Sequence, residues 1–153
     1  MRVGDICTRA VVHCERSTRI PQLAQLMRNR NVGDVVVVDA AGGRLRPIGL
    51  VTDRDLVLEV LAQGVPPDTL TAQDLVRDGV LTAGENDTVY DAIWHMRSRN
   101  VRRLPVVDDD GALVGVLSVD DVIGFLSQEM TQVARVAHDQ IKAERAHRAP
   151  LAG

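Results

Sequence analysis

The feature that most constrains the fold of this chain is an internal repeat. When the sequence is shifted by 69 residues, the segment from Met27 to Asp39 aligns with the segment from Met96 to Asp108, and eight of the thirteen positions are identical. Beyond the turn that follows, the offset falls to 66, and Gly49-Leu-Val-Thr-Asp-Arg-Asp55 aligns with Gly115-Val-Leu-Ser-Val-Asp-Asp121. The change of offset lies in a glycine-containing turn, where changes of length are tolerated. The chain is therefore a tandem duplication.

Each copy contains the same predicted elements in the order β-α-β-β-α. A short apolar strand comes first, at Val11-Val12 or Val80-Leu81, and a helix with apolar residues at i, i+3, i+4 and i+7 follows it. Two β-branched runs joined by a turn then predict a hairpin. The closing helix begins at Thr52 or at Ser118. The predicted helix and hairpin cover residues 20–27 and 35–51 in the first copy, and residues 89–96 and 104–117 in the second.

These elements predict an α/β (α+β) chain in which two repeats pack about a pseudo-twofold axis. A unit of about 60 residues buries little apolar surface by itself, so we expect the two repeats to share one core. Such packing creates two related clefts between the repeats, where ligand sites commonly form. The predicted parts are residues 1–63 for the first repeat, 64–69 for a linker, 70–128 for the second repeat and 129–153 for a helical tail.

The strand Val101-Arg-Arg-Leu-Pro-Val-Val-Asp108 and the two turns of the form Gly-apolar-apolar-Thr/Ser-x-x-Asp resemble a tandem CBS-domain pair (a Bateman module). The resemblance covers roughly residues 1 to 128. Residues 52–58 and 64–72 are also similar to stand-alone bacterial CBS pairs of the hypoxic-response-protein type. The resemblance implies a module that regulates without catalysing. It implies no required cofactor, and an adenine nucleotide (AMP, ADP or ATP) or S-adenosylmethionine as regulatory ligand.

The pair Thr52 and Asp55, and its equivalent Ser118 and Asp121, allow two interpretations. A Ser/Thr-x-x-Asp pattern before an apolar run is a helix capping box. A carboxylate at a first helical turn can also accept hydrogen bonds from both hydroxyl groups of a ribose, with the Thr or Ser hydroxyl adding another. Occurrence at equivalent places of a CBS-like repeat favours the ribose contact, and one residue can serve both roles. The glycine before each pair is expected to let a ligand approach the strand.

The remaining ligand contacts are predicted from the resemblance and from charge. Phosphate groups need donors or cations, and CBS pairs often place them just before the second strand. The phosphate candidates are Arg30, Arg99, Arg54, Arg102 and Arg103. The adenine is expected against the first strand and its exit, near Val12, His13, Leu81 and Thr82.

The two copies differ where phosphates are expected. The second copy has Arg102-Arg103 where the first has Gly33-Asp34, and Asp120 where the first has Arg54. We therefore expect an anionic ligand to bind the two clefts with unequal affinity.

Composition limits the other function classes. The net charge is −3, and 17 of the 18 basic residues are scattered arginines. Only three aromatic residues occur, so a nucleic-acid surface is not expected. No apolar run reaches the length of a membrane span, and no secretory leader is visible, which indicates a cytoplasmic protein without membrane contact. No GxSxG, HExxH, P-loop or GxGxxG motif is present, and we expect no enzyme.

Cys7 and Cys14 have no metal-ligand spacing, and no metal site is predicted. We expect both to be free thiols of a reducing compartment. A cross-link through Cys14 at a subunit interface is the alternative.

Apolar residues at positions 130, 133, 134, 137 and 141 predict an amphipathic helix between Glu129 and Ala146. It either closes onto its own module or contacts a second copy in a homodimer. The leading hypothesis is a stand-alone module that binds an adenosine-containing ligand and signals to an unidentified protein partner. The alternative is a ligand-free dimeric scaffold in which the Thr/Ser-x-x-Asp turns only cap helices.

Overall fold

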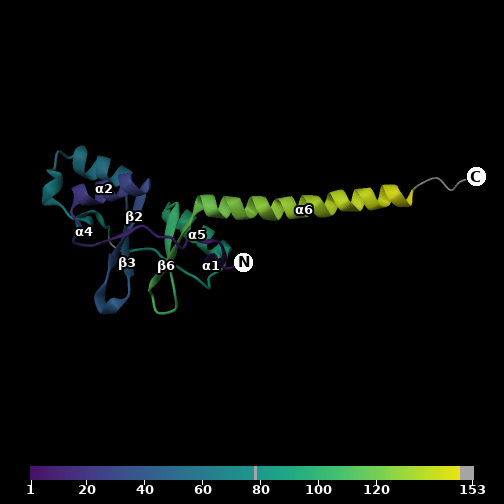
Figure 1. The fold of residues 1–153 in the computed structure, drawn as a ribbon, viewed down its shortest axis with the longest axis horizontal. Coiled ribbons are helices and arrows are strands. Elements are labelled where there is room, and N and C mark those ends of the chain that lie inside the picture. The colour runs from purple at the N-terminus through teal and green to yellow at the C-terminus, as the bar shows by residue number, and fades with distance from the viewer. Residues whose placement is uncertain (78, 149–153) are drawn as a thin grey trace, which may run out of the picture.

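The computed structural model of the chain describes residues 1–77 and 79–148 (Figure 1). The first repeat contains β1 (His13–Glu15), α2 (Ile20–Arg30), β2 (Asp34–Asp39), the 3₁₀ turn η1 (Ala41–Gly43), β3 (Arg46–Thr52), α3 (Asp53–Asp55) and the π-helical η2 (Leu56–Leu61). The second contains β4 (Ala83–Gly84), α5 (Val89–Arg99), β5 (Arg103–Val107), β6 (Leu113–Ser118) and α6 (Val119–His147). The short elements α1 (Val3–Ile6), η3 (Pro67–Thr69) and α4 (Ala72–Leu75) lie in the segments that precede each repeat. The predicted order of elements and the α+β class are confirmed.

Each repeat forms its own three-stranded sheet, in the order β1-β2-β3 or β4-β5-β6. In each sheet the first strand is parallel to the second, and the second and third form an antiparallel hairpin. The register shifts after Val37 in one hairpin and after Val106 in the other, which are equivalent positions. The two sheets therefore have the same topology, and each hairpin has a register shift at the equivalent position.

The position of the predicted first strands is wrong. The strands begin at His13 and Ala83, after the apolar pairs Val11-Val12 and Val80-Leu81. These pairs are half-buried in the connecting segment, where Val12 packs against the core of the first repeat and Leu81 against that of the second. Apolar residues that are buried outside a sheet carry the same local signal as a buried strand.

The expectation of one shared core is also wrong, because each repeat has a core of its own. The first core is built on Leu23 and Met27 of α2, and the second on Ala92 and Met96 of α5, as the helical spacing predicts.

Each core is completed by a segment that precedes the other repeat in sequence. Val3 of α1 is fully buried in the core of the second repeat, where the backbone amide of Gly4 donates to the carbonyl of Glu85 (2.9 Å). Ala72 of α4 is fully buried in the first core, and its amide donates to the carbonyl of Thr18 (2.8 Å). The domain boundaries given above remain a prediction, but the two repeats exchange their leading segments.

The glycine before each capping box makes room for these exchanged segments. A Cβ atom on Gly49 would lie 2.5 Å from Cγ1 of Val76, and one on Gly115 would lie 2.7 Å from Sγ of Cys7. Cys7 and Val76 are equivalent residues of the repeat. The glycines therefore permit close packing of protein on the strand, and the ligand approach expected at the same glycines stays a prediction.

The closing helix of the second repeat and the predicted tail form one continuous helix, α6, which projects away from both sheets (Figure 1). Every residue from Leu126 to His147 is exposed, so the interpretation that the tail closes onto its own module is wrong. Residues 149–153 of the predicted tail lie outside the described residues. Within the described residues, no helix has the length and apolarity that crossing a membrane requires.

Candidate functional site

Thr52 ends β3 and is the N-cap of α3, with extended backbone angles (φ −106°, ψ 162°). Its hydroxyl oxygen accepts a hydrogen bond from the amide of Asp55 (3.1 Å), and Oδ2 of Asp55 accepts one from the amide of Thr52 (2.8 Å). This is the reciprocal capping box that the sequence predicts.

Ser118 and Asp121 repeat the arrangement at the start of α6, with the same two distances of 3.1 and 2.8 Å. Here the Ser118 hydroxyl also donates to Oδ2 of Asp121 (2.6 Å). In both boxes the cap uses Oδ2. Among the described residues, Oδ1 of Asp55 and of Asp121 makes no hydrogen bond, and both side chains are half-buried. Each cap therefore leaves one carboxylate oxygen able to accept further hydrogen bonds.

A cleft of about 840 Å³ lies between the repeats at the first capping box. Six of the predicted site residues line it: Thr52, Arg54, Asp55, Leu81, Arg102 and Arg103. Thr52 and Asp55 come from the end of the first repeat, whereas Leu81 and Arg102 belong to the second. The cleft therefore combines the predicted ribose pair of one copy with predicted adenine and phosphate contacts of the other.

A smaller cleft of about 180 Å³ lies at the second capping box. It is lined by the predicted residues Ser118, Asp121 and Val12, again from both repeats. The two clefts are related by the repeat, because Val12 corresponds to Leu81 and Thr8 of the smaller cleft corresponds to Arg77 of the larger.

Four predicted site residues line neither cleft. His13 is exposed on β1 next to buried Cys14, and Thr82 is a half-buried residue directly before β4. Arg30 and Arg99 are the exposed last residues of α2 and α5. Each is followed by a left-handed asparagine, Asn31 (φ 52°) or Asn100 (φ 53°), which turns the chain.

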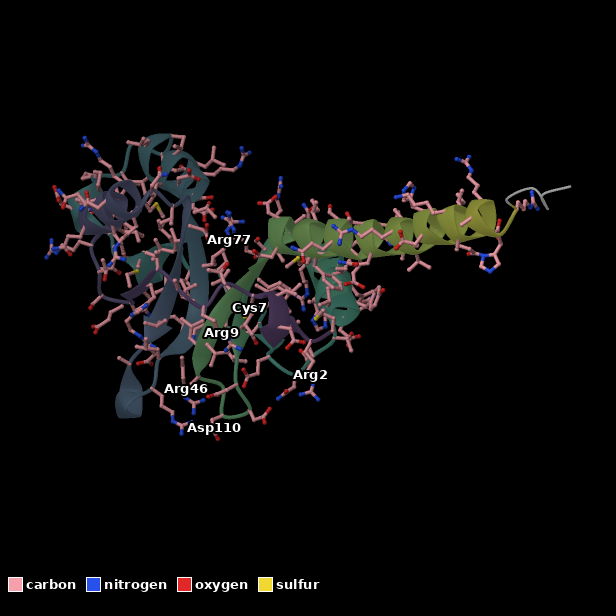
Figure 2. All side chains as sticks on the ribbon, turned by 45° about the vertical axis from the view of Figure 1, so that its right-hand side comes forward. Arg2, Cys7, Arg9, Arg46, Arg77 and Asp110 are labelled. Atoms are coloured by element: carbon pink, nitrogen blue, oxygen red, sulfur yellow. The ribbon has the colours of Figure 1, made fainter. Side chains whose placement is uncertain are left out.

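The charge of the two clefts differs more than the sequence comparison indicated. The larger cleft contains four arginines: Arg54, Arg77, Arg102 and Arg103. Their repeat equivalents are Asp120, Thr8, Gly33 and Asp34, none of which is basic. Arg77 was not predicted from the sequence; it pairs with Glu59 (2.7 Å) and lies on the side of the first repeat that faces the start of α6 (Figure 2). The sequence offers one indication of its place, because Arg77 and its equivalent Thr8 each lie four residues before a predicted adenine contact, Leu81 or Val12.

An ion pair between Arg103 and Asp34 separates the two clefts. Arg103 lines both clefts, and Asp34 lines the smaller one. Burial raises the pKa of the Asp34 carboxyl above its ordinary value, while Arg103 opposes the shift and the nearby charge of Asp53 adds to it. The carboxylate of Asp34 therefore lies where the two clefts meet, paired with Arg103, which also lines the larger cleft.

The family model of the CBS domain matches residues 3–62 and 72–128. The chain belongs to the CBS-domain family. The family is regulatory, and no catalytic family is indicated. The chain is 31% identical to Hypoxic response protein 1 of Mycobacterium tuberculosis over 124 residues, which cover 81% of this chain and 84% of that protein. It is 36% identical to the uncharacterized protein MK0525 of Methanopyrus kandleri over 79% of this chain, and spans 60% of that protein's length.

Solved CBS structures resemble the chain over most of its length. The CBS domain protein PAE2072 from Pyrobaculum aerophilum, complexed with AMP, has a TM-score of 0.70 and 30% identity over 79% of this chain and 89% of its own. The Hypoxic Response Protein I structure has a TM-score of 0.70 and 28% identity over 80% of this chain and 97% of its own, and contains two coordinated zinc ions. Within residues 1–77 and 79–148 of this chain, no three His, Cys, Asp or Glu side chains gather in a group that could hold a metal ion.

Proposed function

We propose that this chain is a stand-alone regulatory module that binds an adenosine phosphate in the larger cleft. The observation that carries the proposal is that Thr52 and Asp55 of one repeat share this cleft with Leu81 and Arg102 of the other. The AMP in the PAE2072 structure supports an adenosine ligand in a pair of this kind.

Each part of the ligand has a matching group in the cleft. Oδ1 of Asp55 accepts hydrogen bonds from the ribose hydroxyls, and the hydroxyl of Thr52 adds another. The adenine lies against Leu81, and the phosphate is held by Arg54 and Arg102, because guanidinium groups form strong charge-assisted hydrogen bonds with phosphate.

The smaller cleft is the weaker site for an anion. Four arginines against three aspartates give the larger cleft a net charge of +1, whereas one arginine against two aspartates gives the smaller cleft −1. Ligand pockets in proteins typically measure about 300–1,000 Å³, a range that includes 840 Å³ and excludes 180 Å³. Ser118, Asp121 and Val12 are the contacts proposed there, and we assign no ligand contact to His13, Thr82, Arg30 or Arg99.

A ligand in the larger cleft touches both repeats and stabilises the relative arrangement that it binds better. That shift is the proposed signal to a protein partner. A cytoplasmic location and a homodimeric state complete the proposal.

Isothermal titration with AMP, ATP and adenosine tests the site. We expect one site per chain that prefers the phosphates to adenosine. Asp55→Asn keeps an oxygen for the cap but removes a charged acceptor, and hydrogen bonds to charged groups contribute about 1.5–3 kcal/mol. The affinity should therefore fall about 10- to 100-fold. Asp121→Asn is the matched control, because it makes the same change in the equivalent cap and should leave this affinity unchanged. Equal losses in both variants would contradict the assignment.

The ligand-free scaffold is the second candidate, because the observed caps account for Thr52 and Asp55 without a ligand. Thermal unfolding separates the two candidates, since a ligand that binds only the folded state raises the midpoint. If millimolar AMP, ADP, ATP, NAD and S-adenosylmethionine all leave the midpoint unchanged, the scaffold interpretation holds.

A further inference from the structure

The exposed part of α6 is the largest feature that ligand binding leaves unexplained. Every residue from Leu126 to His147 is exposed, and this part of the helix projects away from both repeats (Figure 1). Helical segments of proteins gain most of their stability from packing an apolar face rather than from intrinsic propensity. The projecting segment therefore needs a partner.

An apolar stripe marks the face that such a partner would cover. We define the α6 stripe as Ile123, Leu126, Met130, Val133 and Ala137. Its large side chains are all exposed, from 41% for Leu126 to 70% for Met130. The steps along the stripe are three, four, three and four residues, which is the a/d spacing of a coiled coil. The spacing identifies the missing partner as another helix.

The charges of α6 exclude two other kinds of partner. The charged residues of α6 after Leu126 are Glu129, Arg135, Asp139, Lys142, Glu144 and Arg145, whose charges sum to zero. A helix that lies on a membrane surface carries a polar face rich in Lys and Arg, and a nucleic-acid surface is basic. Within the described part of α6, none of these charges falls inside the stripe. The stripe itself carries no charge and therefore matches an equally uncharged stripe, such as that of a second copy.

We propose that the α6 stripe pairs with the same stripe of a second copy of this chain, in a parallel and in-register coiled coil. In this register each apolar side chain meets its own equivalent. The next core position is Gln140, and its amide meets that of the second copy, each donating and accepting one hydrogen bond. A single polar core residue of this kind fixes register. An antiparallel pair that keeps stripe on stripe, centred between positions 131 and 132, would instead place Ile123 against Gln140 and leave that amide without a polar partner.

This pairing rests on the proposed homodimer and assigns its contact surface, and it is independent of the ligand in the cleft. Light scattering on the full chain tests it with two neighbouring substitutions. Val133→Glu places a charge in the stripe, whereas Gln132→Glu places the same charge on the outer face. The wild type and Gln132→Glu should have twice the 16.7 kDa mass of one chain, and Val133→Glu should have the mass of one. An equal dimer mass for all three overturns the α6 contact but leaves the homodimer, whereas a monomeric wild type overturns both.

Disulfide trapping tests the parallel register. Ile123→Cys and Gln140→Cys should each give a covalent dimer on mild oxidation, because both positions meet their own copies. Thr131→Cys, on the outer face, is the control, and the oxidised wild type corrects for Cys7 and Cys14. If neither Ile123→Cys nor Gln140→Cys forms more covalent dimer than Thr131→Cys, the parallel pairing is wrong. Titration of Val133→Glu with AMP separates this result from ligand binding, which should be unchanged.

Discussion

Asp34 and Arg103 form an ion pair although they occupy the same position of the two repeats, 69 residues apart. Arg44 and Asp110 form a second pair, related by the 66-residue offset of the strands that follow the turn. The Arg44 guanidinium holds the pKa of Asp110 below its usual range by a hydrogen bond and by its charge. Figure 2 shows Asp110 and Arg46 at the adjacent ends of the two hairpins.

Such pairs are possible only after duplication within one chain. In a symmetric dimer of identical units, a residue on the twofold axis meets its own copy, so a charged residue there meets a like charge. Two positions of one chain can change independently and take opposite charges. The same divergence makes the clefts unequal, because Arg103 lines both of them and Asp34 only the smaller.

We expect the two halves of the Asp34–Arg103 pair to differ in their effect on stability. The Asp34 side chain is 14% exposed and the Arg103 side chain 38%. Arg103→Gln leaves a mostly buried carboxylate without its partner and should lower the free energy of unfolding by about 1–3 kcal/mol. Asp34→Asn leaves an arginine that reaches water and should change it by less than about 1 kcal/mol. Urea unfolding measures both values, and equal losses would contradict the asymmetry.

The pH dependence of stability should follow from the raised pKa of Asp34. Below its ordinary value of 3.8 the carboxyl is protonated in both the folded and the unfolded chain. Between that value and the higher folded pKa, the folded chain binds more protons, so the contribution of Asp34 to stability is lost as the pH rises through the folded pKa. Asp34→Asn should therefore gain stability relative to the wild type across this window. Urea unfolding of both proteins measures the difference in their free energies of unfolding. The series starts at about pH 3.5, close to the ordinary pKa of an aspartate, and goes upward. If the wild type instead gains stability relative to Asp34→Asn as the pH rises, the attraction of Arg103 outweighs the effect of burial on the pKa of Asp34.

Much of the fold could be predicted because the repeat shows each element twice. The caps at Thr52 and Ser118 were also predictable, since a capping box needs only four consecutive residues. The exchange of α1 and α4 was not, because Val3 packs on residues more than eighty positions away and no local pattern indicates such a contact.

The site was predicted in part for the same reason. Asp55 and Leu81 depend on local motif and repeat position, and both line the larger cleft. His13 and Thr82 line neither cleft, whereas their neighbours Val12 and Leu81 each line one, because a pattern of short apolar runs does not fix positions to one residue. Arg77 was missed because its place depends on the exchanged segment.

The two thiols should react slowly with an aromatic disulfide reagent in the folded protein. Burial raises the pKa of Cys7 and of Cys14, which lowers the fraction of reactive thiolate at neutral pH. Cys14 is only 7% exposed, and Cys7 is half-buried. We expect Cys7 to react first, Cys14 to react at the rate of unfolding, and both to react at once in urea. Rapid reaction of Cys14 in buffer would restore the alternative of an accessible interface thiol.

A methyl group on Gly49 should destabilise the protein, because it would lie 2.5 Å from Cγ1 of Val76. Val76 is β-branched and cannot rotate away without moving its backbone. Overpacking of this kind costs about 1–3 kcal/mol, so Gly49→Ala should lower the free energy of unfolding by that amount. Gly124→Ala is the control, because nothing lies within 4 Å of its Cβ position on exposed α6, and alanine there should add about 0.5–1 kcal/mol.

The double variant Gly49→Ala, Val76→Ala decides whether the packing of α4 on β3 is the cause. Removing the branched side chain makes room for the new methyl group, so the double variant should lose less stability than the sum of the two single changes. Additive losses would mean that Gly49 is required for another reason, such as the close approach of a ligand in the adjoining cleft. Titration of Gly49→Ala with AMP would then distinguish these causes, because a packing defect alone lowers stability and leaves the affinity of the folded chain unchanged.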